Sequence, residues 1–261
     1  MRNENGKMLF PKPDPCQSGH GTQTLTAAGS LGRPNPGYRI VKKAGEPNQK
    51  YPSQSGADGS LVRQNIIDAA RVLFAEKGYS GAKVEEIVVR AQTTKPMVYY
   101  YFGSKERLFA AVLEDVYAGM REIEQSLKLA KLPALEAMSK VVQVTFDYHA
   151  ANPEWVRLVS IANIHYAKHI LASETIASKN SAIVERMRGL LQRGIKEGVF
   201  RSDADALHIH LLIISLCYYR VSNRHTWKVI FKHDLEADKD ARLQRKMTVE
   251  AVLRYLTSDT G

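Results

Sequence analysis

A very short helix between two helix-start signals dominates the pattern of residues 93–105. Thr94 can cap this helix by accepting backbone N–H groups, and Pro96 fits its first turn, where a missing N–H costs little. Gly103 is typical of a helix end, and Ser104 can cap a new helix directly afterwards. The sequence therefore predicts a short helix that is fixed at both ends.

The side chains of this short helix divide into two sets. Val98, Tyr101 and Phe102 stand at i, i+3 and i+4, so they can share one buried face. The others point elsewhere: Lys95, Met97, Tyr99 and Tyr100. Phenols beside lysine suit contacts with nucleic-acid phosphates and sugars, whereas the alternative is that the tyrosines are core or dimer residues.

Two helices upstream favour the nucleic-acid interpretation. Residues 61–78 carry apolar side chains at i, i+3, i+4, i+7 and i+8 from Ile66, and Gly78 is predicted to end this helix. Residues 84–91 repeat the pattern from Val84, and only two residues separate them from the short helix. This is a helix-turn-helix with a supporting first helix, an arrangement that places its second member in a DNA major groove.

The spacing in residues 61–109 resembles the N-terminal domain of TetR-type regulators. The residues that carry the resemblance are Phe74, Gly78-Tyr79, Val84, Ile87, Ala91, Val98-Tyr99, Tyr101-Phe102, Ser104-Lys105-Glu106 and Leu108. The resemblance implies an all-α protein with an N-terminal three-helix helix-turn-helix domain and an α-helical ligand-binding and dimerisation domain. Two positions depart from the family pattern: Ala82-Lys83 replaces the usual Thr or Ser cap, and Gln92 replaces a turn glycine.

We expect three segments along the chain: residues 1–58 as a disordered extension rich in Pro and Gly, 59–107 as the DNA-binding domain, and 108–258 as the helical body. Seven of the ten prolines and nine of the seventeen glycines precede Leu61, and no apolar period is present there. The extension carries Arg33, Arg39, Lys42, Lys43 and Lys50. It is either a basic arm along DNA, a solvated tail, or the product of a start codon assigned too far upstream.

Composition narrows the class of protein. The 261 residues carry a formal net charge of +10, which favours an anionic partner without naming it. Cys16 and Cys217 lie far apart, which predicts a reducing cytoplasm and no disulfide framework. No apolar run is long enough to span a bilayer, and prolines interrupt the N-terminus, so neither a membrane partner nor a signal peptide is expected.

Apolar periodicity predicts six helices in the body. They cover residues 104–129, 133–151, 153–169, 176–197 and 204–219, followed by a last helix through 243–256. Ser202 or Asp203 is expected to cap the fifth, which is apolar almost all round and must be buried on several sides. This excess of apolar surface on the last two long helices, like the family resemblance, predicts a homodimer through a four-helix interface.

Two polar clusters in the body are candidates for an effector pocket. Trp155, Asn163, Tyr166 and His169 fall on the helix predicted for 153–169, and Tyr218, Asn223 and Arg224 follow the apolar helix. The second cluster loosely resembles the pyrimidine-sensing, RutR-like branch of the family, or it packs the dimer seam and caps helices. His165 and His169 are spaced i, i+4, but a single pair does not make a metal site, so no metal and no cofactor are predicted.

The sequence thus predicts a ligand-responsive transcriptional regulator, most simply a repressor that binds a near-palindromic DNA operator as a homodimer and leaves it when a small-molecule effector binds. Base edges would be contacted near the start of the short helix, and phosphates and sugars by its tyrosines and the next lysine. The predicted DNA-binding residues are Thr93, Thr94, Lys95, Pro96, Met97, Tyr99, Tyr100 and Lys105. The alternatives are a non-specific DNA-organising protein and a helical enzyme that uses the body pocket. No catalytic motif supports an enzyme.

Overall fold

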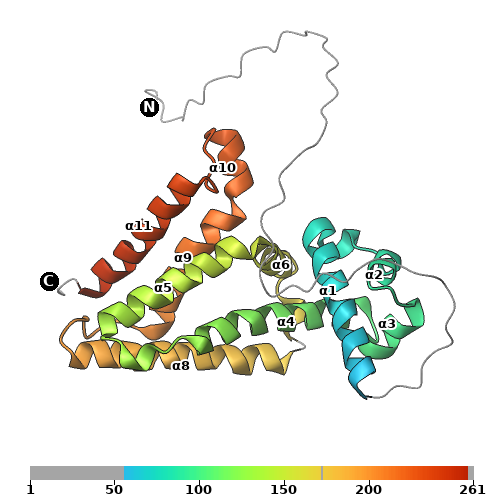
Figure 1. Cartoon of the computed structure of the whole chain (residues 1–261), viewed down its shortest axis with the longest axis horizontal. Helices are drawn as coiled ribbons and strands as arrows, with labels where there is room; N and C mark the ends of the chain where they lie inside the picture. Colours follow the sequence, from blue (N-terminus) through green and yellow to red (C-terminus); the bar gives the residue numbers. More distant parts are fainter. Residues whose placement is uncertain (1–55, 172, 258–261) are drawn as a thin grey trace, which may run out of the picture. The chain divides into compact units, whose positions relative to one another are not determined.

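The computed structural model describes residues 56–171 and 173–257, so the predicted N-terminal extension falls almost wholly outside them. Every regular element in these two ranges is helical (Figure 1). The N-terminal helices are α1 (Gly56–Gly81), α2 (Val84–Arg90), α3 (Lys95–Phe102) and α4 (Lys105–Ser126). After the single 3-10 turn η1 (Leu129–Lys131) follow α5 (Ala134–Ala151), α6 (Pro153–Ile164), α7 (Lys168–Leu171), α8 (Glu174–Lys196), α9 (Ala206–Ser222), α10 (Arg224–Ile230) and α11 (Asp238–Thr257).

The predicted helix-turn-helix is present, and local signals explain its boundaries. Gly103 ends α3 with a left-handed φ of 72°, and the Ser104 hydroxyl accepts the Arg107 N–H at 3.1 Å. Thr94 stands at the N-cap of α3 as expected, but its side chain makes no capping hydrogen bond, so that part of the prediction is wrong. Gly78 interrupts α1 with a non-helical backbone, φ 75° and ψ 171°, as expected for a helix end, and a short helical segment follows to Gly81.

The helices of the predicted DNA-binding domain share a hydrophobic core with part of the body. This core joins α1, α2, α3 and the first half of α4 to α6, and Phe74 and Phe109 are fully buried in it with ring centroids 4.9 Å apart. Trp155 and Leu158 of α6 belong to the same cluster. A movement of α6 or α4 therefore reaches the reading helices through close-packed side chains.

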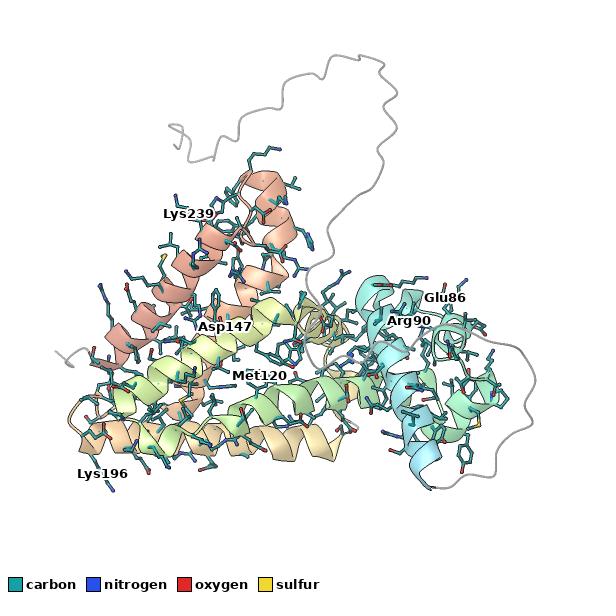
Figure 2. The ribbon with its side chains drawn as sticks, viewed as in Figure 1. Glu86, Arg90, Met120, Asp147, Lys196 and Lys239 are labelled. Carbon is teal, nitrogen blue, oxygen red and sulfur yellow. The ribbon has the colours of Figure 1, made fainter. Side chains whose placement is uncertain are left out.

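A second core holds the remaining helices of the body together. In it α5 packs against α8, α9 and α11, and α4 packs against α5 and α8 (Figure 1). Arg245 of α11 makes a bidentate ion pair with Asp147 of α5, with both N–O distances 2.8 Å. Figure 2 labels Asp147 on α5. Within the described ranges, no helix combines the length and the apolarity needed to cross a bilayer.

Three details of the body differ from the sequence prediction. The helix predicted for 153–169 stops at Ile164, because Tyr166 and Ala167 adopt left-handed φ angles of 56° and 55° before α7 begins. The start of α9 is capped by Asp205, whose Oδ1 accepts the Leu207 and His208 N–H groups at 3.0 Å, so the prediction of Ser202 or Asp203 is wrong. The short helix α10 was not predicted.

Burial of α9 is one-sided in the single chain. Ile209 and Ile213 are 1% exposed, whereas Leu207 and Leu211 on the opposite side are 57% and 59% exposed. Within a single chain, α9 is therefore buried on the side of Ile209 and Ile213 and open on the side of Leu211, whereas burial on several sides was expected.

Candidate DNA-binding surface and effector cavity

The start of α3 presents the predicted DNA-binding residues to solvent. Val98 and Phe102 are buried and hold the helix to the domain. The opposite side is open: Thr94, Lys95, Pro96, Tyr99 and Tyr100 are exposed, and Thr93 and Met97 are half-buried. Seven of the eight predicted residues thus lie in one short segment with access to a partner surface.

Lys95 is paired with an acidic side chain of α2. Its Nζ lies 2.7 Å from Glu85 Oε1. This hydrogen bond and the opposite charge raise the pKa of Lys95 and lower the pKa of Glu85. Any DNA group that binds Lys95 must therefore compete with the Glu85 carboxylate.

Lys105, the eighth predicted residue, is held against the end of α1. Its Nζ lies 4.9 Å from the centre of the Tyr79 ring and donates to the Ser80 carbonyl at 3.5 Å. Burial lowers the pKa of Lys105. The residue is half-buried in the first turn of α4, so it lies off the recognition helix.

The two departures from the family pattern have structural counterparts. Lys83, which replaces the usual cap of α2, has its backbone N–H bonded to the Glu86 carboxylate at 3.4 Å, and the same carboxylate pairs with Lys77 at 2.8 Å. Figure 2 labels Glu86 and Arg90 at the two ends of this helix. Gln92 takes the left-handed conformation, with φ 51°, that a glycine adopts at no steric cost.

A cavity of about 700 Å³ lies in the body between α4, α6, α8 and α9. Its size is that of a site for a small organic molecule. Met120 marks the α4 wall in Figure 2. The lining residues are Tyr117, Met120, Trp155, Val159, Ser160, Asn163, Ile183, Val184, Leu207, His210, Ile214, Ser215 and Tyr218.

The polar groups in the lining bond mainly to the protein itself. The hydroxyls of Tyr218 and Ser160 lie 2.6 Å apart, and each also lies within 3.0 Å of the Val156 carbonyl. The amide nitrogen of Asn163 donates to the Val159 carbonyl at 2.9 Å. Burial raises the pKa of Tyr218 and lowers the pKa of His210, so both are neutral near pH 7.

Of the seven residues predicted for the effector pocket, the structure brings Trp155, Asn163 and Tyr218 to this cavity. The other four lie elsewhere. Tyr166 is 92% exposed in the turn after α6, Asn223 joins α9 to α10, and Arg224 pairs with Glu236 at 3.4 Å. The early end of α6 and the presence of α10 are what separate these side chains from the cavity.

His169, the fourth of these, is buried where α7 meets the DNA-binding domain. It is 1% exposed, its ring centroid lies 4.5 Å from that of Tyr79, and its Nδ1 lies 3.5 Å from Glu106 Oε1. The rings of His165 and His169 are 5.6 Å apart. Across the described ranges, however, no three His, Cys, Asp or Glu side chains gather in a geometry suited to a metal ion.

Several cavity residues were missed from the sequence. Tyr117, Met120 and Ser160 fall in helices whose apolar repeats explain them equally well as core. His210 carried a partial signal, because it and His208 are the histidines that interrupt the apolar run from Leu207 to Ile214.

Comparison with known proteins gives consistent matches over both halves of the chain. Residues 66–112 match the family described as bacterial regulatory proteins, tetR family, and residues 135–252 match the tetracyclin repressor-like C-terminal domain. The HTH-type transcriptional repressor NicS of Pseudomonas putida is 37% identical over 181 residues, covering 69% of this chain and 85% of that protein.

Two further comparisons agree. The HTH-type transcriptional repressor KstR2 of Rhodococcus jostii is 31% identical over 161 residues, covering 59% of this chain and 75% of that protein. A solved tetR-family regulatory protein from Rhodococcus RHA1 superposes with a TM-score of 0.61 at 22% identity, covering 76% of this chain and 98% of the other.

An exposed reading helix and a cavity in an all-helical body define a DNA-binding transcriptional regulator of the helix-turn-helix class. The chain belongs to the TetR family of bacterial regulatory proteins.

Proposed function

We propose that the protein is a repressor that binds a near-palindromic operator as a homodimer and releases it when a small molecule occupies the body cavity. One observation carries this proposal: the walls of the cavity, α4 and α6, also belong to the core that holds the reading helices. The repressor role is supported by the names of the relatives NicS and KstR2. The protein would act in the cytoplasm, where its DNA target is accessible.

The start of α3 would read the operator. Base edges in the major groove would be reached by Thr93, Thr94, Lys95, Pro96 and Met97, a role supported by their position at the accessible N-terminal end of α3. Tyr99, Tyr100 and Lys105 would contact phosphates and sugars. The exposed phenol of Tyr100, 71% accessible, supports this division of roles.

The last two long helices, α9 and α11, would form the dimer. Both leave large apolar side chains in solvent in the single chain: Leu211 is 59% and Tyr219 55% exposed on α9, and Leu243 is 52% and Met247 57% exposed on α11. A two-fold axis through this face would pair each helix with its copy. The symmetry of the dimer would then impose a near-palindrome on the DNA.

Effector binding would act by a population shift. A ligand that fits the cavity only when α4 and α6 are displaced stabilises the conformation with displaced helices. In that conformation the distance between the two DNA-binding domains of the dimer would no longer match the operator half-sites. Direct packing transmits this displacement, because α6 contacts α1 through the shared core and Arg157 of α6 donates to the Glu76 carbonyl at 3.5 Å.

The effector residues follow from the cavity. Trp155, Asn163 and Tyr218 would contact the ligand directly. The other four predicted residues line no part of this cavity and would act indirectly, from the segments next to α7 and α10: Tyr166, His169, Asn223 and Arg224. A pyrimidine base is one compound to test for release of DNA, because the cluster around Tyr218 loosely resembles the pyrimidine-sensing branch of the family.

The test is selection of bound duplexes from random DNA at roughly 150 mM salt, which suppresses contacts that ignore sequence. Enrichment of one near-palindrome is the expected result. Salt-sensitive binding to every duplex without enrichment would instead indicate a DNA-organising protein.

Base-substituted versions of the selected site then separate the roles on α3. Tyr99→Phe should weaken binding to all of them alike, whereas Lys95→Ala or Met97→Ala should change the preferred base. Uniform losses for all three variants would contradict the assignment.

A further inference from the structure

A second cavity, of about 450 Å³, lies where the end of α1 meets α6 and the junction of α9 with α10. It shares Ser160 with the effector cavity, and the hydroxyl of Ser160 is already bonded to the Val156 carbonyl at 2.9 Å. The remaining wall residues are its own, so this cavity can hold a different molecule.

The described wall of the second cavity carries an excess of positive charge. Two of its cations have acidic partners: Lys77 pairs with Glu86 at 2.8 Å, and Arg224 pairs with Glu236 at 3.4 Å. A concave surface with one predominant sign of charge attracts ligands of the opposite sign. The titratable side chains of the wall are Glu76, Lys77, Arg157, Arg224 and His225.

Arg157 of α6 is the cation with the most freedom to bind a ligand. Its side chain is exposed, and its guanidinium reaches across to α1, where one N–H donates to the Glu76 carbonyl at 3.5 Å. Within residues 56–171 and 173–257 this is its single hydrogen bond, and no carboxylate pairs with it. The remaining N–H donors suit a carboxylate or a phosphate, whose oxygens match the planar fork of a guanidinium.

Apolar side chains lie beside these charges. Ala75 and Val221 are each 5% exposed, and Ile161 is half-buried, and all three line the cavity. Water screens an ion pair less beside such a surface than on an open one. The cavity therefore combines an ionic contact with an apolar contact, which is typical of a site for an organic anion.

We propose that this cavity is a second ligand site, for a small organic anion whose carboxylate or phosphate group binds the Arg157 guanidinium. The apolar part of the anion would lie against Ala75, Ile161 and Val221. Such a ligand contacts α1, α6 and the α9–α10 junction at once. Its binding is independent of the proposed operator and of the molecule that occupies the effector cavity.

Equilibrium dialysis of the full chain against three coumarin probes tests the charge preference. The probes are 7-methoxycoumarin-4-acetate, 4-methylumbelliferyl phosphate and the neutral 7-methoxy-4-methylcoumarin. At least one of the two anions should bind saturably and at least about tenfold more tightly than the neutral compound, because charge-assisted hydrogen bonds are the stronger ones. The two anions together distinguish a carboxylate site from a phosphate site.

Three variants that each remove one charge locate the bound anion. Arg157→Gln removes the proposed contact from an exposed position and should weaken binding at least about tenfold. Glu76→Gln removes the acidic side chain of the wall and should strengthen binding roughly two- to fivefold. Arg242→Gln is the matched control for Arg157→Gln, because it removes the same charge from an exposed position of α11 outside this wall. It should leave binding unchanged.

Equal losses in Arg157→Gln and Arg242→Gln would overturn the inference, because they would show that only the net charge matters. It also fails if Arg157→Gln loses nothing, if the neutral probe binds as tightly as the anions, or if neither anion binds saturably. Operator binding is measured separately. A chain that selects no operator but binds an anion through Arg157 contradicts the proposed function and leaves the second site standing.

Discussion

At the scale of single residues, the ion pair of Lys95 with Glu85 is expected to oppose DNA binding by the proposed recognition helix. Glu85→Gln removes a negative charge beside the reading helix and releases Lys95, so we expect affinity for the operator to rise roughly two- to tenfold at fixed salt. Fluorescence anisotropy with a labelled operator duplex measures this affinity.

Glu86→Gln is the matched control for this change. It neutralises the neighbouring residue, but Glu86 pairs with Lys77 at the end of α1 and caps α2. Its effect on affinity should be much smaller. Equal gains for both variants would mean that only the overall charge of the domain matters.

Buried histidines make stability depend on pH. Burial lowers the pKa values of His149, His169 and His210, so the unfolded chain binds more protons than the folded one as pH falls below about 6.5. The free energy of unfolding should therefore drop on acidification through that range, by up to about 1.4 kcal/mol per pH unit for each histidine.

Urea unfolding of a His149→Phe variant between pH 5 and 7 checks this expectation, because the aromatic ring keeps the packing on Trp155 while removing one titrating group. Its pH slope should be smaller by up to about one proton. A slope that does not change in His149→Phe would refute the role of this residue.

At the scale of elements, two glycines of α8 should respond oppositely to alanine. A Cβ on Gly194 would fall inside the ring of Phe200, whereas a Cβ on Gly189 would meet no atom within 4 Å. Gly194→Ala should lower the free energy of unfolding by about 1–3 kcal/mol through overpacking. Gly189→Ala should raise it by roughly 0.5–1 kcal/mol, because alanine favours a helix. Denaturation with urea compares the two, and equal effects would contradict the packing of Phe200.

The turn between α2 and α3 carries a strained residue. Gln92 has φ 51°, and replacing it by glycine should stabilise the domain by about 1 kcal/mol. Gln92→Ala keeps the strained conformation and should bring no gain. Thermal unfolding distinguishes the two variants; stabilisation by alanine alone would point to a side-chain effect.

The helix boundaries show which parts of the fold could be predicted from the sequence. Periodicity and caps located α2, α3 and α4 closely, because short-range signals such as Gly103 and Ser104 determine their ends. The stop of α6 was not predictable, since nothing in the residue types of Tyr166 and Ala167 opposes a helix, although both adopt a left-handed φ. The cavity needs α4, α6, α8 and α9 together, so only Trp155, Asn163 and Tyr218 were found in advance.

At the scale of the whole molecule, dimerisation through α9 and α11 is testable by charge insertion. Leu211→Glu should weaken the dimer at least about a hundredfold, because a two-fold axis buries two copies of the carboxylate. Sedimentation equilibrium gives the dissociation constant, and operator binding should fall with it. Leu171→Glu, on the 85% exposed side chain of α7, is the control. A dimer that survives the α9 change would place the interface elsewhere.

The core shared by α1–α4 and α6 limits how this protein can be re-engineered. One way to change the DNA specificity would be to exchange the N-terminal segment for that of a relative. Here the transplanted segment would lose the side chains of α6, including Trp155 and Leu158, that complete its interior. A functional hybrid should therefore keep the α1 residues that face α6 and exchange only the exposed surface of α3, so that the two parts remain compatible.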